Sequence, residues 1–293
     1  MRLSRGLRYE ISLSKPAPMY KRVMRLATPA LLAACAGSEP SAPDTPAAHP
    51  NFITDGVPTG TSFGNVGALL FDFDGSGTID GFEVDCTGSL IAPTVFLTAA
   101  HCVAFFPADA QLYVSFDAAL LPGPPNVIAA EAFHFDPAFG HDLANLHDLA
   151  VIILPAGSTT GITPLQLPPA GFLSESAAQG GLRGQLFVNV GYGVDASQRG
   201  HPAFGFDGVR KTSKSPFQAL LPNWLKLLMN TNASSEGGVC FGDSGSPHFV
   251  DGSPGMAVAT TTGGDPLCRA LNYNFRLDTP TARAFLGQYV QLP

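Results

Sequence analysis

The sequence FLTAAHC at residues 96–102 places His101 at the end of a short apolar run, directly before a cysteine. Two later segments carry complementary groups: HDLAVI at residues 147–152 sets Asp148 at the start of an apolar run, and GDSGSP at residues 242–247 sets Ser244 between two glycines. A serine hydroxyl is a weak nucleophile unless an imidazole accepts its proton and a carboxylate fixes the tautomer of that imidazole. These three segments therefore predict nucleophilic catalysis by Ser244.

Outward from these segments, the body of the chain alternates short apolar runs with turn residues. The whole chain holds 32 glycines and 26 prolines, 45% of its residues are hydrophobic and only 13% are charged. This balance favours many short strands around a large core. Residues 279–290 open with Thr-Pro and carry apolar residues at helical spacing, which predicts a helix. Residues 222–229 fit either a helix or a strand. Strands are predicted at residues 67–71, 89–91, 95–98, 112–116, 150–154, 186–190 and 257–260.

The motifs TAAHC at 98–102, HDLAVI at 147–152 and GDSGSP at 242–247 resemble the His, Asp and Ser segments of the trypsin/chymotrypsin family, in the same order along the chain. The Gly-Tyr-Gly triplet at residues 191–193 resembles a further landmark of that family. The resemblance covers residues 53–293. It implies an all-β fold of two packed six-stranded antiparallel β-barrels with a short C-terminal helix.

The resemblance also implies a role for each residue of the motifs. Ser244 would be the nucleophile, His101 the general base and then acid, and Asp148 the orienting carboxylate. The backbone N–H groups of Gly242 and Ser244 would form the oxyanion hole. The implied activity is that of a serine endopeptidase that cuts peptide bonds through an acyl-enzyme. The alternative is a non-catalytic binding module that uses the same fold at a cell surface.

Four of the five cysteines lie in the body of the chain, and four cysteines allow three pairings. The sequence alone does not choose among these pairings. The family resemblance implies one bridge between Cys86 and Cys102 and a second between Cys240 and Cys268. Each would stabilise the fold by about 3 kcal/mol on the loop-entropy estimate. An even set of cysteines suits an exported protein.

The first 52 residues are predicted to direct export rather than to fold with the body. Lys21, Arg22 and Arg25 precede an apolar stretch at residues 26–34, as in a secretory signal. Residues 32–35 (LAAC) resemble the lipobox of bacterial lipoproteins, which implies lipidation of Cys35 and a membrane anchor; an ordinary cleaved signal is the alternative. We therefore divide the chain into a signal segment at 1–35, a Pro/Ala/Ser-rich linker or propeptide at 36–52, and a protease domain at 53–293. The expected protein is a secreted or extracytoplasmic, bacterial member of the family.

Asp243 directly precedes the nucleophile, and in the resembled family this carboxylate pairs with an amine released by cleavage. The sequence ITDG at residues 53–56 resembles the family's new N-terminus. This implies that Ile53 and Asp243 form an activation pair after a cut between Phe52 and Ile53. Phe52 departs from the basic residue usual at that place.

The specificity pocket implied by the resemblance lacks an acidic residue. Gly238 stands at the expected base, six positions before Ser244, where trypsins have an aspartate. Thr262 and Gly263, with the neighbouring Gly264, are expected to line the wall. The pocket therefore predicts a preference for apolar or aromatic side chains and argues against cleavage after Lys or Arg.

Residues 72–83 (DFDGSGTIDGFE) match the twelve-residue calcium loop of EF-hands at its ligand positions. The flanking segments read as strands, so the expected role is a structural Ca²⁺ that stiffens a surface hairpin. The alternative is a solvated Asp/Gly turn. No cofactor is expected for catalysis. The candidate ligands are Asp72, Asp74, Ser76, Thr78, Asp80 and Glu83.

The net charge of −7 argues against a nucleic-acid partner, because no basic stripe exists to neutralise phosphates. No apolar run reaches the ~20 residues that a membrane-spanning helix needs. We expect protein or peptide substrates and a monomeric enzyme. The other histidines show no spacing that demands a role and are predicted to lie at the surface or in loops; they are His134, His141, His147, His201 and His248.

Overall fold

The structure is a computed structural model that describes residues 53–54, 56–196, 204–230 and 237–293. The predicted signal segment at 1–35, with Cys35, and the linker at 36–52 lie outside the described residues. Within the described part, no helix is long and apolar enough to cross a membrane.

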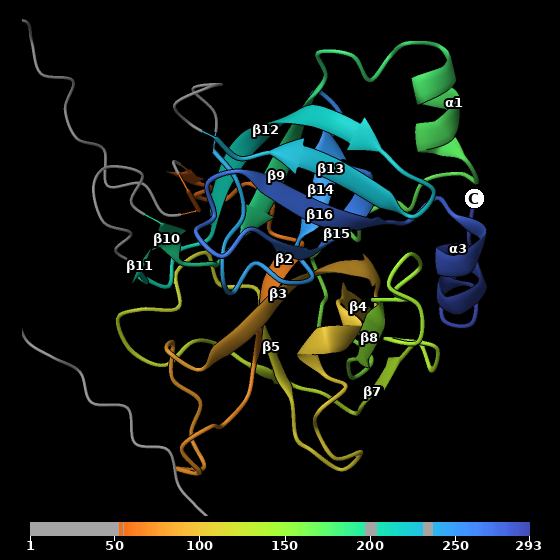
Figure 1. Cartoon of the computed structure of the whole chain (residues 1–293). Helices are drawn as coiled ribbons and strands as arrows, with labels where there is room; N and C mark the ends of the chain where they lie inside the picture. Colours follow the sequence, from red (N-terminus) through yellow and green to blue (C-terminus); the bar gives the residue numbers. More distant parts are fainter. Residues whose placement is uncertain (1–52, 55, 197–203, 231–236) are drawn as a thin grey trace, which may run out of the picture. The chain divides into compact units, whose positions relative to one another are not determined.

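The first half of the domain is an antiparallel sheet in the order β6-β5-β2-β3-β4-β8-β7, drawn in orange to light green in Figure 1. Residues 128–135 connect its two edges. Ala130 N donates to Leu112 O, beside β5, and Glu131 N donates to Ile153 O, in β8. β6 and β7 are thus two parts of one bent segment that closes six strands into a barrel. The strands are β2 (Val66–Leu70), β3 (Val84–Ala92), β4 (Val95–Thr98), β5 (Tyr113–Ser115), β6 (Ile128–Ala129), β7 (Ala132–Phe135) and β8 (Ala150–Ile153).

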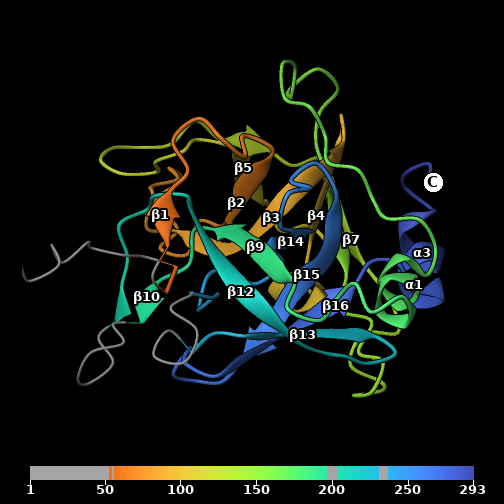
Figure 2. The same ribbon diagram turned by 90° about the horizontal axis from the view of Figure 1, so that it is seen from above.

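The second half is a six-stranded sheet in the order β12-β13-β16-β15-β14-β9. Its last strand, β9, also pairs with its first, β12, and this pairing closes the sheet into a barrel. These strands are the teal and blue arrows of Figure 1 and are seen from above in Figure 2. The short β1 (Val57–Pro58) adds to β12, and β10 (Asp195–Ala196) pairs with β11 (Phe204–Gly205). The barrel strands are β9 (Leu186–Gly191), β12 (Lys211–Leu220), β13 (Trp224–Leu228), β14 (Pro247–Val250), β15 (Ala257–Gly264) and β16 (Leu271–Arg276).

The predicted fold of two six-stranded barrels and a C-terminal helix is confirmed. The helix α3 (Pro280–Leu286) begins at Thr279, whose hydroxyl accepts from Ala282 N at 3.2 Å. The ambiguous segment at 222–229 is a strand, β13, which alternates half-buried and buried side chains. The short helix α1 (Phe172–Ala178) was not predicted, because a single buried residue, Leu173, gives it no helical periodicity.

The two barrels share one hydrophobic cluster. Leu97 and Leu149 of the first barrel belong to the same buried group as Val190 and Phe249 of the second, together with Phe285 of α3. Such a joint core fixes the two barrels against each other, so loops from both can form one site at their boundary.

Arg210 adds polar contacts at the same boundary. Its side chain is 2% exposed, and its guanidinium donates to the backbone oxygens of Val66 at 2.9 Å and Phe116 at 3.0 Å. It also donates to Ser62 O and to the hydroxyl of Tyr192. A residue next to β12 is thereby bonded to the strands of the first barrel.

Candidate active site

The predicted histidine and aspartate are bonded to each other. His101 lies in the 3₁₀ turn η1 (Ala100–Cys102) after β4, and Asp148 lies just before β8. β4 and β8 are paired, with Thr98 opposite Ala150, which brings the two segments together. Asp148 is fully buried; one carboxylate oxygen lies 2.9 Å from His101 Nδ1 and the other accepts from His101 N at 2.9 Å. This bond occupies Nδ1 and leaves Nε2 as the nitrogen that can exchange protons.

The electrostatic surroundings of His101 favour its charged form. Burial disfavours the imidazolium, but the hydrogen bond and charge of Asp148 and the charge of Asp85 outweigh that cost, and the pKa of His101 is raised above its ordinary value of 6.5. A more basic imidazole is a stronger proton acceptor. Asp85 was not among the residues that the motifs identified.

Ser244 lies in a turn tied to the first barrel. Its carbonyl accepts from Thr87 N of β3 at 2.9 Å. A Cβ on the next residue, Gly245, would lie 2.2 Å from Thr98 Oγ1 and 2.7 Å from Ala99 N, so a side chain there has no room. The nucleophile segment therefore contacts the strand end that leads to His101. Within the described part of the chain, the Ser244 hydroxyl makes no hydrogen bond to His101; such bonds are often long in a free enzyme.

Gly242 adopts a backbone conformation that suits the predicted oxyanion hole. Its φ of +93° lies in the left-handed region, and a Cβ there would come within 3.1 Å of Gly193 Cα. Its carbonyl accepts from the Thr87 hydroxyl at 2.8 Å. These contacts hold the 242–244 turn in one conformation, which an oxyanion hole of backbone N–H groups requires.

Asp243 is fully buried and accepts two backbone hydrogen bonds, from Gly193 N at 2.8 Å and from Cys240 N at 2.9 Å. Burial raises its pKa to about 7, although both hydrogen bonds and the charge of Lys211 act in the opposite direction. Ile53, its predicted partner, is also buried. In the uncut chain Ile53 N belongs to a peptide bond, and the structure places no bond between Ile53 and Asp243.

The structure joins Cys86 to Cys102 with an S–S distance of 2.05 Å, and Cys240 to Cys268. These are the pairings that the family resemblance implies. Cys86 and Cys102 directly follow Asp85 and His101, respectively, so the first bridge fixes those two residues near each other.

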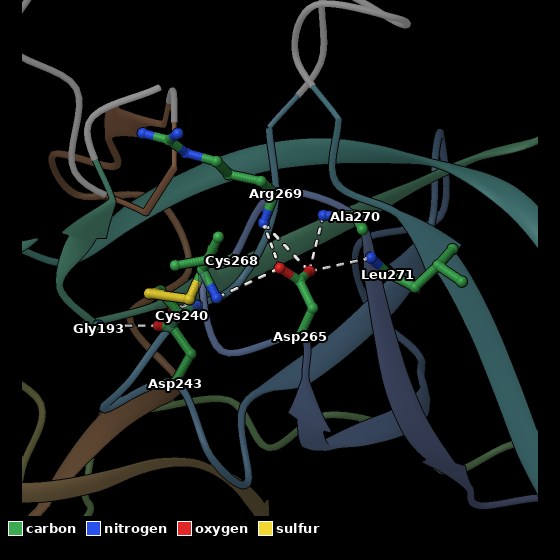
Figure 3. The surroundings of a disulfide bond; sticks show 9 residues. Gly193, Cys240, Asp243, Asp265, Cys268, Arg269, Ala270 and Leu271 are labelled. Carbon is green, nitrogen blue, oxygen red and sulfur yellow. Dashed lines mark hydrogen bonds between the residues drawn. A yellow bond between two sulfur atoms is a disulfide. The ribbon is translucent and has the colours of Figure 1, made fainter. Parts of the chain in front are cut away.

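The second bridge joins the Ser244 segment to a loop organised by Asp265 (Figure 3). The carboxylate of Asp265 accepts from the backbone N–H groups of Arg269, Ala270 and Leu271, with the shortest bond, to Ala270 N, at 2.7 Å. Asp265 thus accepts hydrogen bonds from backbone N–H groups that the loop would otherwise leave unpaired.

A cavity of about 260 Å³ opens beside Ser244 and is lined by Thr262 and Gly263 of the predicted pocket. Gly238, the predicted base, is not among its lining residues; a Cβ on Gly238 would lie 2.4 Å from Cγ of the buried Met229. Met229 therefore packs against Gly238, and Val239, the residue after Gly238, lines the cavity. The remaining lining residues are Cys240, Phe241, Thr261, Gly264, Asp265, Pro266 and Cys268.

The predicted calcium loop brings three carboxylates together. Oxygens of Asp72, Asp74 and Glu83 lie within 4.8 Å of one another. Backbone N–H groups already contact these oxygens: Asp72 accepts from Gly77 N, and Glu83 accepts from Phe73 N and Asp80 N. The other predicted ligands make local contacts, with the Ser76 hydroxyl bonded to Thr78 and the Asp80 carboxylate accepting from Phe82 N.

The prediction for one other histidine, His248, is wrong. His248 is fully buried in β14, where Asn189 Oδ1 lies 2.8 Å from its Nδ1 and Thr261 Oγ1 lies 2.7 Å from its Nε2. Burial lowers the pKa of His248 to about 3. Asn189 precedes His248 by 59 residues, so no local motif announces that contact. His147 lies in a loop, as predicted, with its Nδ1 2.9 Å from Asp136 Oδ2. His201 lies outside the described residues.

Comparison with known proteins agrees with this architecture. A family model described as Trypsin matches residues 71–284. Similar solved structures include an HBP structure at atomic resolution, with 18% identity, a TM-score of 0.58, and coverage of 82% of this chain and 98% of that chain. HL collagenase has 19% identity, a TM-score of 0.56 and coverage of 80% and 97%. Human heparin binding protein has 19% identity, a TM-score of 0.57 and coverage of 81% and 96%. No curated protein matches the chain.

Proposed function

The chain belongs to the trypsin family, and from that membership we propose that it is an extracytoplasmic serine endopeptidase that acts through Ser244, His101 and Asp148. The observation that carries the proposal is the buried Asp148 carboxylate bonded to both His101 Nδ1 and His101 N. A buried carboxylate that orients an imidazole beside a serine turn has a direct use in acyl transfer.

In the proposed reaction Ser244 Oγ attacks the scissile carbonyl and gives its proton to His101 Nε2. The N–H groups of Gly242 and Ser244 stabilise the oxyanion, and His101 returns the proton to the leaving amine. Water then attacks the acyl-enzyme with His101 again as base. Asp148 keeps Nδ1 protonated throughout and offsets the charge that His101 acquires.

The proposed acyl-side preference is for apolar or aromatic side chains. The cavity beside Ser244 is walled by Val239 and two glycines, and among the described residues the only carboxylate along its wall, Asp265, accepts from backbone donors. A cationic side chain entering it would lose hydration without gaining a free counter-charge. Peptides cleaved after Phe or Leu should therefore exceed those cleaved after Arg in kcat/KM.

Three further proposals concern the setting of the domain. Export is proposed because the two disulfides suit an oxidising compartment; lipidation of Cys35 would show as a mass increase lost in Cys35→Ala. A structural Ca²⁺ at residues 72–83 is supported by the three clustered carboxylates. Activation by cleavage before Ile53 is supported by the complete burial of Ile53 and Asp243; N-terminal sequencing of active protein tests it.

A binding module without catalysis is the second candidate. The similar structures carry names of both kinds, a collagenase and a heparin binding protein, so the fold does not choose between them. Binding of a polyanion such as heparin is disfavoured by the net charge of −7.

Covalent labelling separates the two candidates. A phosphonate that reacts with activated serines should label the wild type at Ser244 and should not label Ser244→Ala, and casein hydrolysis should be lost in the same variant. Ser253→Ala, an exposed serine in the turn after β14, is the matched control and should retain both. Absence of label and of hydrolysis in folded, processed wild type would favour the binding module.

A further inference from the structure

A second cavity, of about 430 Å³, is lined by Phe241 and Gly242, directly before the nucleophile segment. It shares Phe241 with the cavity beside Ser244, so the two hollows flank the same short segment. Half of its lining residues are aromatic: Phe82, Tyr192, Phe206 and Phe241. Phe82 and Phe241 are 67% and 56% exposed, an unusual cost for large apolar side chains unless they contact a ligand.

One carboxylate faces this aromatic cavity. Asp85 lines it together with Gly242. Its Oδ2 is buried and has no hydrogen-bond partner among the described residues. A carboxylate oxygen that is buried without a partner gains most from a cation that enters beside it.

The position of Asp85 indicates which part of a peptide substrate this cavity would bind. His101 must give its proton to the leaving amine, so the departing part of a substrate lies on the His101 side of Ser244. The charges of Asp85 and His101 interact, and the Cys86–Cys102 bridge holds the two neighbouring positions together. The cavity beside Ser244 is assigned to the acyl side, which leaves the aromatic cavity for the leaving group.

We propose that Asp85 and the aromatic walls around it form a pocket that selects a lysine or arginine side chain on the leaving-group side of the scissile bond. This inference rests on the proposed peptidase function. A carboxylate among aromatic side chains suits the recognition of a cation, since ring faces attract cations and the carboxylate pairs with them. The enzyme would then combine an apolar requirement before the cut with a cationic one after it.

Acyl transfer to added amines measures this pocket directly. An ester substrate with a phenylalanyl acyl group forms the same acyl-enzyme in every experiment, and dipeptide amides then compete with water for it. The amides are Arg-Ala-NH₂ and Ala-Arg-NH₂, compared with analogues that carry norleucine or Glu in place of Arg. In the wild type the aminolysis-to-hydrolysis ratio should be about tenfold higher for one Arg amide than for its norleucine analogue, equivalent to about 1.4 kcal/mol.

Variants assign the preference to Asp85. Asp85→Asn should abolish the Arg advantage, and Asp85→Lys should favour the Glu amide; each ratio compares two fates of one acyl-enzyme and does not depend on the overall rate of ester hydrolysis. Asp109→Asn removes an exposed carboxylate elsewhere in the same barrel and should keep the Arg advantage. Equal ratios for Arg and norleucine in the wild type, or an Arg advantage that persists in Asp85→Asn, overturn the pocket alone. No ester hydrolysis by the wild type, equal to Ser244→Ala, overturns the peptidase function and the pocket together.

Discussion

At the scale of single residues, the proposed chemistry depends on how two carboxylates act on one imidazole. Asp148 contacts His101 directly, whereas Asp85 acts on it through charge, and both raise the pKa of His101 against the effect of burial. A base with a raised pKa is a better acceptor but is charged, and therefore inactive as a base, over a wider range of acid pH.

The pH profile should report this balance. We expect kcat/KM to rise with pH through the His101 pKa, at a midpoint above 6.5. Asp85→Asn should move the acid limb to lower pH, because it removes a charge that stabilises the imidazolium. Measurement of kcat/KM from pH 5 to 9 with a neutral peptide tests both points, and Asp109→Asn is the control. An unchanged or upward-shifted limb in Asp85→Asn would contradict the assignment.

At the scale of elements, the site is held by loops whose backbone donors are compensated by buried or half-buried carboxylates. Asp243 bonds the turn before Ser244 to Gly193, and Asp265 caps the loop that carries Cys268. Both loops lie beside the Cys240–Cys268 bridge (Figure 3). The pocket wall is therefore held by these carboxylates as well as by the pairing of β15 with β16.

Asp265→Ala should destabilise the domain by about 1–3 kcal/mol, because several backbone N–H groups lose their acceptor. Asp265→Asn keeps one acceptor oxygen and should lose less. Urea denaturation with the disulfides intact measures the difference, and kcat/KM for phenylalanyl substrates should fall with it. Equal stabilities for Asp265→Ala and the wild type would show that the loop is held by other contacts.

The loop at 72–83 carries the calcium prediction. At a free Ca²⁺ concentration of 100 times the Kd, binding would stabilise the folded state by about 2.7 kcal/mol. Thermal melting in Ca²⁺ and in a chelator should differ for the wild type and coincide for Glu83→Gln, which removes the charge of a predicted ligand. Calorimetry without a Ca²⁺ binding signal, or melting that the chelator leaves unchanged, would reject the site.

At the scale of the whole molecule, the candidate site exists because two barrels share one boundary. His101, Asp148 and Asp85 come from the first barrel, whereas Ser244 and the acyl-side cavity come from the second. The shared cluster of Leu97, Val190 and Phe249 and the bonds of Arg210 hold these parts in register.

Arg210→Met should cost about 3–5 kcal/mol, because it leaves carbonyls such as Val66 O and Phe116 O buried without a donor. Arg183→Met, an exposed arginine, is the control and should change stability by less than about 0.5 kcal/mol. Chemical denaturation measures both. Loss of activity in Arg210→Met below its unfolding transition would further indicate that the two barrels have shifted relative to each other.

The sequence by itself determined the class of fold, the terminal helix and the His, Asp and Ser segments. Each of these can be predicted from short stretches of neighbouring residues. Apolar runs such as 150–154 predict strands, and GDSGSP combines a nucleophile with the glycines that its turn requires. The pairing of the four cysteines came from the family resemblance and not from spacing.

Tertiary structure alone decided what lies around those segments. It placed Met229 against Gly238, buried His248 in the barrel, and brought Asp85 beside both His101 and an aromatic cavity. The energies of these contacts depend on burial and distance rather than on local sequence pattern. A motif can identify a catalytic group, but tertiary packing determines which charges and which pockets surround that group.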